Sequence, residues 1–415
     1  MLSCYRVLDL TNEKGFLCGR ALGDLGADVI KIEPPGGEPS RNIGPFYHDI
    51  ADSEKSLYWF AFNANKRGIT LDITTVDGRE IFGKLVKTAD VVIESFAPGH
   101  MDKLGLGYEV LSRINPGIVM TSISGFGQKG PYRDFNDRDI AVWALSGYMF
   151  IAGEPDRPPL VPSYPHGHLL GAANAAVGTM IALFNRHTTG RGQQVDSSTQ
   201  QGLCFAISVE TKVPWAMQQV IATREGRDRS NIIAKDGTIK LPLLWECKDG
   251  DVAYTFWLGT GFAKANTTLV EWIKESGVDP GILGSFDWEN EDWSYYTVED
   301  VKQVRRTLHE FFAMYTKMEL SDGALQRRIQ LTPVLTPKDQ LKFPQLVERG
   351  FWREIEHPEL NDTITYPGGF VKPGEGDCGI RFRAPLIGEH NGEVYEKELG
   401  LSAEDLIILK QRRII

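Results

Sequence analysis

The chain has 415 residues, of which 42% are apolar and 24% charged, as is typical of a soluble globular protein too long for one simple core. A formal net charge of −10 argues against a general nucleic-acid binder, because phosphate contacts need clustered Lys and Arg. Five scattered cysteines predict reduced thiols. The sequence starts without a leader pattern and has no apolar run of about 20 residues, so we expect a cytoplasmic protein with no membrane association.

The first part of the chain alternates short apolar runs with helical patterns. Strands are predicted at residues 7–10, 28–33, 91–94 and 118–123, and helices at 16–25, 78–88 and 108–114. Such alternation indicates βαβ units, and therefore a largely parallel sheet that helices cover on both faces.

Further helices are predicted at 140–149, 168–187 and 198–209, and a further strand at 194–196. The helix at 168–187 is rich in Gly and Ala, small residues that allow another backbone to approach closely. It ends where Gly190 can adopt the positive φ of a helix stop.

A second, smaller domain is predicted after a polar segment without clear periodicity. Apolar runs at 241–247 and 252–257 flank residues 248–251, a pattern typical of a β-hairpin, and helices follow at 264–275 and 298–312. The last helix has Ser402 as N-cap. The predicted organisation is a large domain at 1–214, a linker at 215–235, an α+β domain at 236–332, and a linker and C-terminal tail at 333–415.

Several common site motifs are absent from the sequence. There is no G-x-G-x-x-G after the first strand, no P-loop motif, no G-x-S-x-G and no H-E-x-x-H. His166 and His168 are two positions apart, which places them on different faces of a helix. We therefore predict neither a dinucleotide site nor a metal site, and no covalently bound cofactor.

Seven segments together resemble the class III CoA-transferase family, which includes formyl-CoA transferase, carnitine CoA-transferase and α-methylacyl-CoA racemase. They are VLDL at 7–10, LGDLGADVIKIEPPGG at 22–37, NKRGITLD at 65–72, ADVVIESFAPG at 89–99, SISGFGQKGP at 122–131, TGRGQ at 189–193 and LIGEH at 386–390. Each segment alone is unspecific, but they occur in the order and spacing of the family over most of the chain.

The resemblance implies a Rossmann-like large domain built from both chain ends, a smaller α+β domain, and an interlocked dimer. It also implies coenzyme A or an acyl-CoA as substrate, bound along the large domain. The matching positions for CoA contacts are Glu13, Lys14, Leu71, Asp72, Ile73, Thr74, Ser95, Phe96, Ala97, Lys103, Asp137, Arg138, Asp139 and Ile140. Without the resemblance, Lys103 would be read as a solvated lysine and Phe96 as a core residue. Thr74, where some members have lysine, and a short loop at 12–14 depart from the family pattern.

The position of the family's nucleophilic aspartate falls on His168, or on Gly167 if a gap is placed differently. In active members that aspartate attacks the acyl-CoA thioester and later carries CoA as a thioester. No Asp or Glu occurs between Arg157 and Arg191. An imidazole has no carbonyl group to hold the sulfur, and a helix N-terminus disfavours its protonated form. We therefore expect His168 to be neutral and hydrogen-bonded, in a structural or substrate-contact role.

The sequence is similar to one branch of the family, succinyl-CoA:(R)-benzylsuccinate CoA-transferase of anaerobic toluene degradation. The resemblance implies two homologous but different subunits, of which only one has the nucleophilic aspartate. On this interpretation the chain is the subunit without the nucleophile, and it forms a heterodimer or heterotetramer with a homologous subunit that carries the catalytic Asp. Its substrates would be an acyl-CoA such as succinyl-CoA and a dicarboxylic acid.

Two other interpretations remain open from the sequence. The chain could be an independent acyl-CoA isomerase or lyase with His166 or His168 as base, although Arg138 replaces the histidine of the family's racemases. Alternatively, it could be an acyl-CoA-binding homologue without catalytic activity. Activity of the purified chain alone would favour the first of these two.

Overall fold

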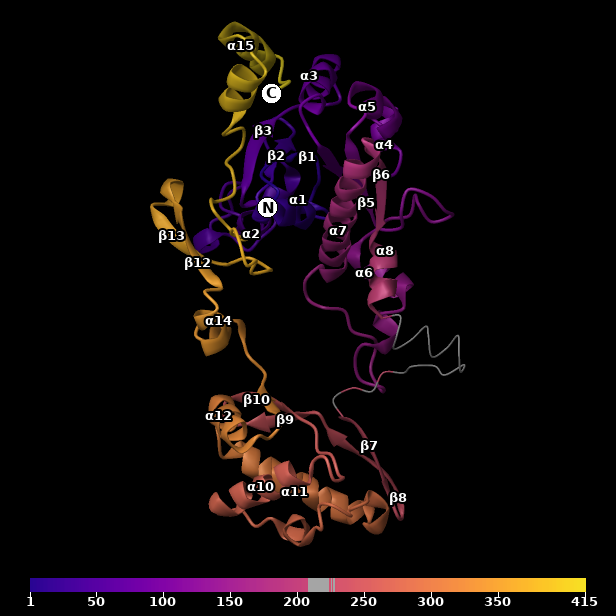
Figure 1. Ribbon diagram of the computed structural model, residues 1–415, viewed down its shortest axis with the longest axis vertical. Coiled ribbons are helices and arrows are strands. Elements are labelled where there is room, and N and C mark those ends of the chain that lie inside the picture. Colours follow the sequence, from indigo (N-terminus) through magenta and orange to yellow (C-terminus); the bar gives the residue numbers. More distant parts are fainter. Residues whose placement is uncertain (208–223, 225, 227) are drawn as a thin grey trace. The chain divides into compact units, whose positions relative to one another are not determined.

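The computed structural model describes residues 1–207, 224, 226 and 228–415. The chain forms two compact units, one of Met1–Phe150, Val161–Ala222 and Pro344–Ile415, and one of Ile151–Leu160 and Thr223–Phe343. Figure 1 shows both units and labels most of their elements. The larger unit is built from both ends of the chain, as the sequence predicted.

The larger unit contains a six-stranded parallel sheet in the order β3-β2-β1-β4-β5-β6. Its strands are β1 Arg6–Asp9, β2 Asp28–Glu33, β3 Lys66–Thr70, β4 Val91–Glu94, β5 Val119–Ser124 and β6 Gln194–Ser198. The predicted α/β class and parallel sheet are confirmed, and the predicted strands correspond to β1, β2, β4, β5 and β6.

Alternate residues of each strand enter separate cores on the two faces of the sheet, as the pleat requires. Val7 packs with Cys18 of helix α1 and Ala172 of helix α7, whereas Leu8 packs with Phe82 of helix α3 on the other face. The helices of this unit are α1 Phe16–Asp24, α2 Leu57–Asn63, α3 Val76–Val86, α4 His100–Lys103, α5 Tyr108–Ile114, α6 Asp139–Ser146, α7 His166–Thr189, α8 Thr199–Ala206, α14 Pro344–Glu348 and α15 Ala403–Gln411.

The C-terminal segment completes the core of the larger unit. Val394, Tyr395 and Ile414 are buried with Leu8 and Phe82 in the same cluster. The Tyr395 hydroxyl donates to the Thr70 carbonyl oxygen at 2.6 Å. Before this segment, β12 Trp352–His357 and β13 Asp362–Pro367 form an antiparallel pair.

The smaller unit has an α+β core. A three-stranded antiparallel sheet, in the order β11-β10-β9, packs with three helices around residues such as Trp245 and Phe312. The elements are β7 Asp228–Ala234, β8 Gly237–Pro242, β9 Leu244–Cys247, β10 Gly250–Tyr254, β11 Leu331–Pro333, α10 Ala263–Glu275, α11 Val298–Ala313, α12 Lys317–Arg327 and α13 Pro337–Gln340. The predicted hairpin is confirmed as β9 and β10, which pair Cys247 with Gly250.

The predicted linker at 215–235 differs from the structure at its end. Residues 215–223, 225 and 227 lie outside the described residues, but β7 pairs with β8 over residues 228–234. Ile232 and Ala234 are buried and Ile233 between them is exposed, so a short period-two pattern marks a strand that the polar composition concealed.

Helix α7 is the one helix among the described residues that is long and apolar enough to cross a membrane by length and composition. Half of its most apolar stretch is buried inside the protein. Ala172, Ala175 and Ala176 are buried and belong to the core between α1 and the sheet. This packing is that of a core helix.

Candidate functional site

The centre of the site is the point where the strand order of the sheet reverses. From β1 the chain builds outward to β2 and β3, and from β4 outward to β5 and β6. In open α/β sheets, ligands bind in the crevice at such a switch point, which here is at the carboxyl ends of β1 and β4. Asn12 follows β1 and Ser95 follows β4. The Asn12 backbone N–H donates to Ser95 Oγ at 2.8 Å, and this hydroxyl donates to Asn12 Oδ1 at 2.8 Å, so the two loops are tied together.

Carboxyl groups near the strand ends hold the loops that follow them. Asp72 accepts the Thr74 backbone N–H at 2.9 Å, and Glu94 accepts the Phe96 backbone N–H at 2.9 Å. Burial raises the pKa of Glu94 to about 7, against the effect of its hydrogen bonds with Ser122 and Phe96. The sheet itself therefore fixes two of the segments predicted to contact CoA.

Lys14 joins the loop after β1 to the segment before α6. Its Nζ lies 2.5 Å from Asp137 Oδ1, and the Gly125 backbone N–H donates to Asp137 Oδ2 at 3.1 Å. Both side chains of the pair are only partly exposed. Two predicted site residues, 123 positions apart in the chain, are thus brought into contact.

Glu13 is held from a different direction. Ser40, in the loop after β2, donates its hydroxyl hydrogen to Glu13 Oε2 at 2.7 Å. The Tyr58 hydroxyl of α2 donates to the Glu13 carbonyl oxygen at 3.4 Å. Ser40 and Tyr58 were not among the predicted site residues. Each comes from a separate loop or helix, and neither lies in a recognisable motif.

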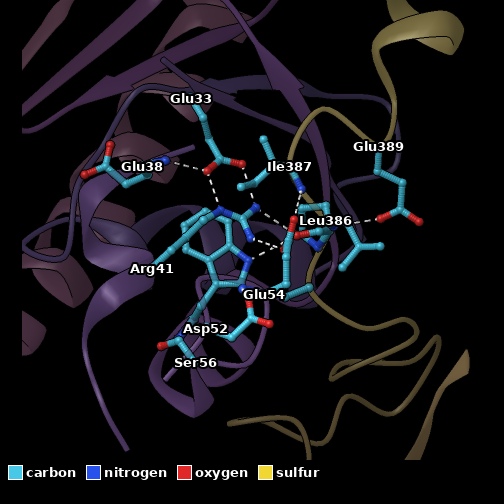
Figure 2. A network of polar contacts seen from close by, with 12 residues as sticks. Glu33, Glu38, Arg41, Asp52, Glu54, Ser56, Leu386, Ile387 and Glu389 are labelled. Carbon is cyan, nitrogen blue, oxygen red and sulfur yellow. Dashed lines mark hydrogen bonds and ion pairs between the residues drawn. The ribbon is translucent and has the colours of Figure 1, made fainter. Parts of the chain in front are cut away.

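The loop after β2 is anchored by Arg41, whose surroundings Figure 2 shows. The guanidinium donates to Glu33 at 2.6 and 2.7 Å, to Glu54 at 2.7 Å and to the Pro385 carbonyl oxygen at 3.0 Å. It also lies over the Trp59 ring, 3.7 Å from its centroid. A fully buried arginine therefore joins β2, the following loop and the C-terminal segment.

His168 lies in the first turn of α7 and is buried, with 6% of its surface exposed. Its backbone N–H donates to Asp139 Oδ1 at 2.9 Å, so a carboxylate from α6 caps α7. Burial lowers the pKa of His168, against the charges of Asp139 and Asp137, which act in the opposite direction. We expected a hydrogen-bonded imidazole, and for Nδ1 this expectation is wrong. This nitrogen is buried and has no hydrogen-bond partner among the described residues.

The structure distinguishes between the two positions proposed for the missing nucleophile. A Cβ atom on Gly167 would lie 2.7 Å from Asp139 Oδ1 and 3.0 Å from Trp143 Nε1, so a side chain there would have to displace the carboxylate that caps α7. His168 has a side chain at the neighbouring position of the same helical turn. A side chain is therefore accommodated at residue 168 as the structure stands, whereas one at residue 167 would require Asp139 to move.

The other predicted residues differ in what they present to the crevice. The side chains of Leu71 and Ile73 are buried in the sheet core, so a ligand could reach only their backbone atoms. Phe96 is half-buried, with its ring centroid 4.8 Å from that of His100. The exposed residues of the predicted set are Thr74, Ala97, Lys103, Arg138 and Ile140.

His166 does not join His168. Its Nδ1 lies 3.0 Å from the carbonyl oxygen of Tyr164, in the segment before α7. Within the part of the chain that the structure describes, no group of three or more His, Cys, Asp or Glu side chains could hold a metal ion.

Comparisons with known proteins agree on one family. The family model described as CoA-transferase family III matches residues 2–391. The chain is 34% identical over 397 residues to a succinyl-CoA:(R)-benzylsuccinate CoA-transferase subunit, BbsE of Thauera aromatica, covering 94% of this chain and 93% of the relative. It is 30% identical to a succinyl-CoA–L-malate CoA-transferase alpha subunit of Chloroflexus aurantiacus, covering 100% of this chain and 92% of the relative. A crystal structure of a CAIB/BAIF family protein from Brucella suis superimposes with a TM-score of 0.80 at 25% identity, covering 95% of this chain and 98% of that one.

Proposed function

The chain belongs to CoA-transferase family III, and we propose that it is the subunit without the nucleophile in a heteromeric CoA-transferase. A homologous partner subunit supplies the catalytic aspartate, in a heterodimer or heterotetramer. The names of relatives as separate subunits support a heteromeric enzyme. The interlocked arrangement of the two chains, a cytoplasmic location and a role in anaerobic toluene degradation belong to the same proposal and rest on the sequence resemblance.

The observation that carries this proposal is the lack of a carboxylate at the expected nucleophile position. In the alignment that the family resemblance implies, His168 stands at this position, and its imidazole has no carbonyl carbon on which CoA could be carried as a thioester. The neighbouring carboxylates are already engaged, Asp137 by the Lys14 ammonium group and Asp139 by the N-terminus of α7. On this proposal, the group that attacks the acyl-CoA comes from the partner subunit.

The proposed substrates are succinyl-CoA as CoA donor and (R)-benzylsuccinate as acceptor. The support is the similarity to BbsE, together with the wider occurrence of succinyl-CoA in the names of the relatives. In the proposed site CoA lies in the crevice between β1 and β4. It contacts Glu13, Lys14, Ser95, Phe96, Ala97, Lys103, Asp137, Arg138, Asp139 and Ile140, the backbone of Leu71 and Ile73, and the Asp72–Thr74 turn.

Co-expression with an aspartate-carrying homologue tests the proposal. We expect transfer of CoA from succinyl-CoA to benzylsuccinate only when both chains are present. During turnover stopped by acid, mass spectrometry should find the acyl or CoA adduct on the partner alone. An adduct on any residue of this chain would contradict the proposal. Activity of the purified chain, abolished by His168→Ala, would support an independent enzyme instead.

Two further variants sharpen this experiment. His168→Asp places a carboxylate where a side chain fits, so this chain should then take up an adduct at residue 168. His166→Asp is the matched control, because His166 contacts Tyr164 and lies outside the cluster of Lys14, Asp137 and Asp139. An adduct in the control but not in His168→Asp would show that residue 168 is not the nucleophile position.

A further inference from the structure

Two lysines are fully buried beneath the loop that follows β1. Lys31 on β2 and Lys66 on β3 both have 0% of their side chains exposed. The same is true of Asp9, the last residue of β1, whose carboxylate contacts both ammonium groups. Taking an ammonium group out of water costs several kcal/mol unless hydrogen bonds and an opposite charge compensate. Asp9 is one carboxylate facing two ammonium groups, so hydrogen-bond acceptors from other residues have to supply most of the compensation.

Lys66 Nζ uses its three hydrogens on three elements of the fold. It donates to Asp9 Oδ2 at 2.7 Å, to Asn63 Oδ1 at 2.8 Å and to the Phe16 carbonyl oxygen at 3.0 Å. The last of these acceptors is the first residue of α1. Lys66 thereby fixes the end of the loop that connects β1 to α1.

Lys31 Nζ holds the start of the same loop. It donates to the Thr11 carbonyl oxygen and, at 3.3 Å, to that of Asp9, and it lies 3.6 Å from Asp9 Oδ1. The Asp9 carboxylate also accepts the Thr11 backbone N–H at 2.9 Å and the Thr11 hydroxyl at 2.6 Å. Both ends of the loop therefore have their carbonyl oxygens turned inward, onto the two ammonium groups.

Between these two fixed ends the loop carries Glu13 and Lys14. Both side chains act electrostatically on His168, and Lys14 pairs with Asp137 across the crevice. A shift of the loop would move these two side chains together relative to the other loops of the site.

We propose that Lys31 and Lys66 are positioning residues of the CoA site, which hold from within the protein the loop that presents Glu13 and Lys14. The inference rests on the proposed CoA-transferase function. Neither lysine contacts the substrate, because both are covered by the loop and by the Phe16 ring, whose centroid lies 5.2 Å from Lys31 Nζ and 5.4 Å from Lys66 Nζ.

The proposal has a consequence for the pH dependence of CoA binding. Burial lowers the pKa of Lys66 to about 8, although the Asp9 carboxylate opposes this change. The charged or titratable groups that face Lys66 are Asp9 on β1, Lys31 on β2 and Cys18 on α1, and burial raises the pKa of Cys18 to about 12. Lys66 therefore loses its proton at a lower pH than an ordinary lysine, and its hold on the Phe16 carbonyl oxygen weakens as the pH rises through about 8.

Binding of S-methyl-CoA to the full-length protein, measured by calorimetry, tests this inference, because this thioether has no titratable thiol. For the wild type we expect the affinity to fall about tenfold between roughly pH 7 and pH 9.5, with the midpoint close to the pKa of Lys66. Lys66→Met should bind about tenfold more weakly at pH 7 and show no change with pH. Lys87→Met, an exposed lysine at the end of α3, should behave as the wild type.

Asn63→Leu gives an independent readout if Lys66→Met does not fold. It removes one acceptor of the Lys66 ammonium group and leaves the charges in place, so the midpoint of the pH profile should move to lower pH. An unchanged profile in Lys66→Met, or an unchanged midpoint in Asn63→Leu, would overturn the positioning role while CoA binding stands. If the wild type bound no S-methyl-CoA at any pH, the proposed function would fail together with this inference.

Discussion

The backbone N–H of His168 lies 2.9 Å from a carboxylate oxygen of Asp139, which precedes it by 29 residues in the chain. The first turn of α7 is thus capped by α6, and the imidazole at the family's nucleophile position is held in an acidic, buried environment. A side chain on the adjoining residue, Gly167, would have to displace this carboxylate. The following predictions test this arrangement and the loops around it.

Gly167→Ala should destabilise the protein, although replacing glycine in a helix usually stabilises it. The new Cβ would meet Asp139 Oδ1 at 2.7 Å, so we expect the free energy of unfolding in urea to fall by about 1–3 kcal/mol. Gly83→Ala in α3 is the matched control, because its nearest neighbour, Ile114 Cδ1, would lie at an ordinary 3.8 Å. The control should gain about 0.5–1 kcal/mol. Equal gains in both variants would contradict the crowding at Gly167.

Glu94→Gln should change how stability depends on pH. Because burial raises the pKa of Glu94 to about 7, the folded protein retains this proton at pH values where the unfolded chain has lost it. The free energy of unfolding of the wild type should therefore decrease between about pH 4.5 and pH 7, by up to a few kcal/mol, and Glu94→Gln should lack this decrease. Exposed Glu80→Gln serves as control and should follow the wild type. Parallel curves for the wild type and Glu94→Gln would refute the buried-carboxyl interpretation.

Arg41→Met should be strongly destabilising. It leaves the buried Glu33 carboxylate without its bidentate partner, which typically costs about 3–5 kcal/mol. We also expect faster limited proteolysis near residue 385, because Arg41 donates to the Pro385 carbonyl oxygen. Arg133→Met removes an exposed ion pair with Asp134 and should change the free energy of unfolding by less than about 0.5 kcal/mol. A similarly small change in Arg41→Met would argue against an anchoring role.

Lys14→Met should weaken CoA binding without unfolding the protein. It removes a positive charge from the site, and it leaves the negative charge of Asp137 without its partner. Both effects disfavour an anionic ligand. We expect the dissociation constant for CoA to rise about tenfold in calorimetry at low salt, and less at high salt. Lys84→Met in α3 matches the charge change at an exposed position and should leave the affinity unaltered. Unchanged affinity in Lys14→Met would place CoA elsewhere.

Most of the large sheet could be predicted because β1, β2, β4 and β5 each contain a short, mainly apolar run. β3 was missed, because Lys66, Arg67 and Gly68 do not read as a buried strand. Lys66 is buried against Asp9, which lies 57 residues earlier in the chain, and no local pattern records such a contact. β7 was missed for a related reason, since polar residues surround its short alternating segment.

Several predicted site residues lie together through contacts that the sequence could not predict. The family resemblance pointed to Lys14, Asp137, Asp139 and His168, whereas the Lys14–Asp137 ion pair and the capping of α7 join loops that are far apart in the sequence. The unpartnered Nδ1 of His168 had no sequence signal either, because it depends on how neighbouring helices fill space.

The division of the larger unit between both chain ends has a consequence for biosynthesis. Leu8 and Phe82 leave the ribosome early, but Val394, Tyr395 and Ile414, which cover them, follow only after the whole smaller unit has been translated. At about 5–20 residues per second, this apolar face of the nascent sheet stays uncovered for tens of seconds. Ribosome-bound chains that stop short of the C-terminal segment should therefore be strong clients of chaperones, even though the smaller unit is by then complete.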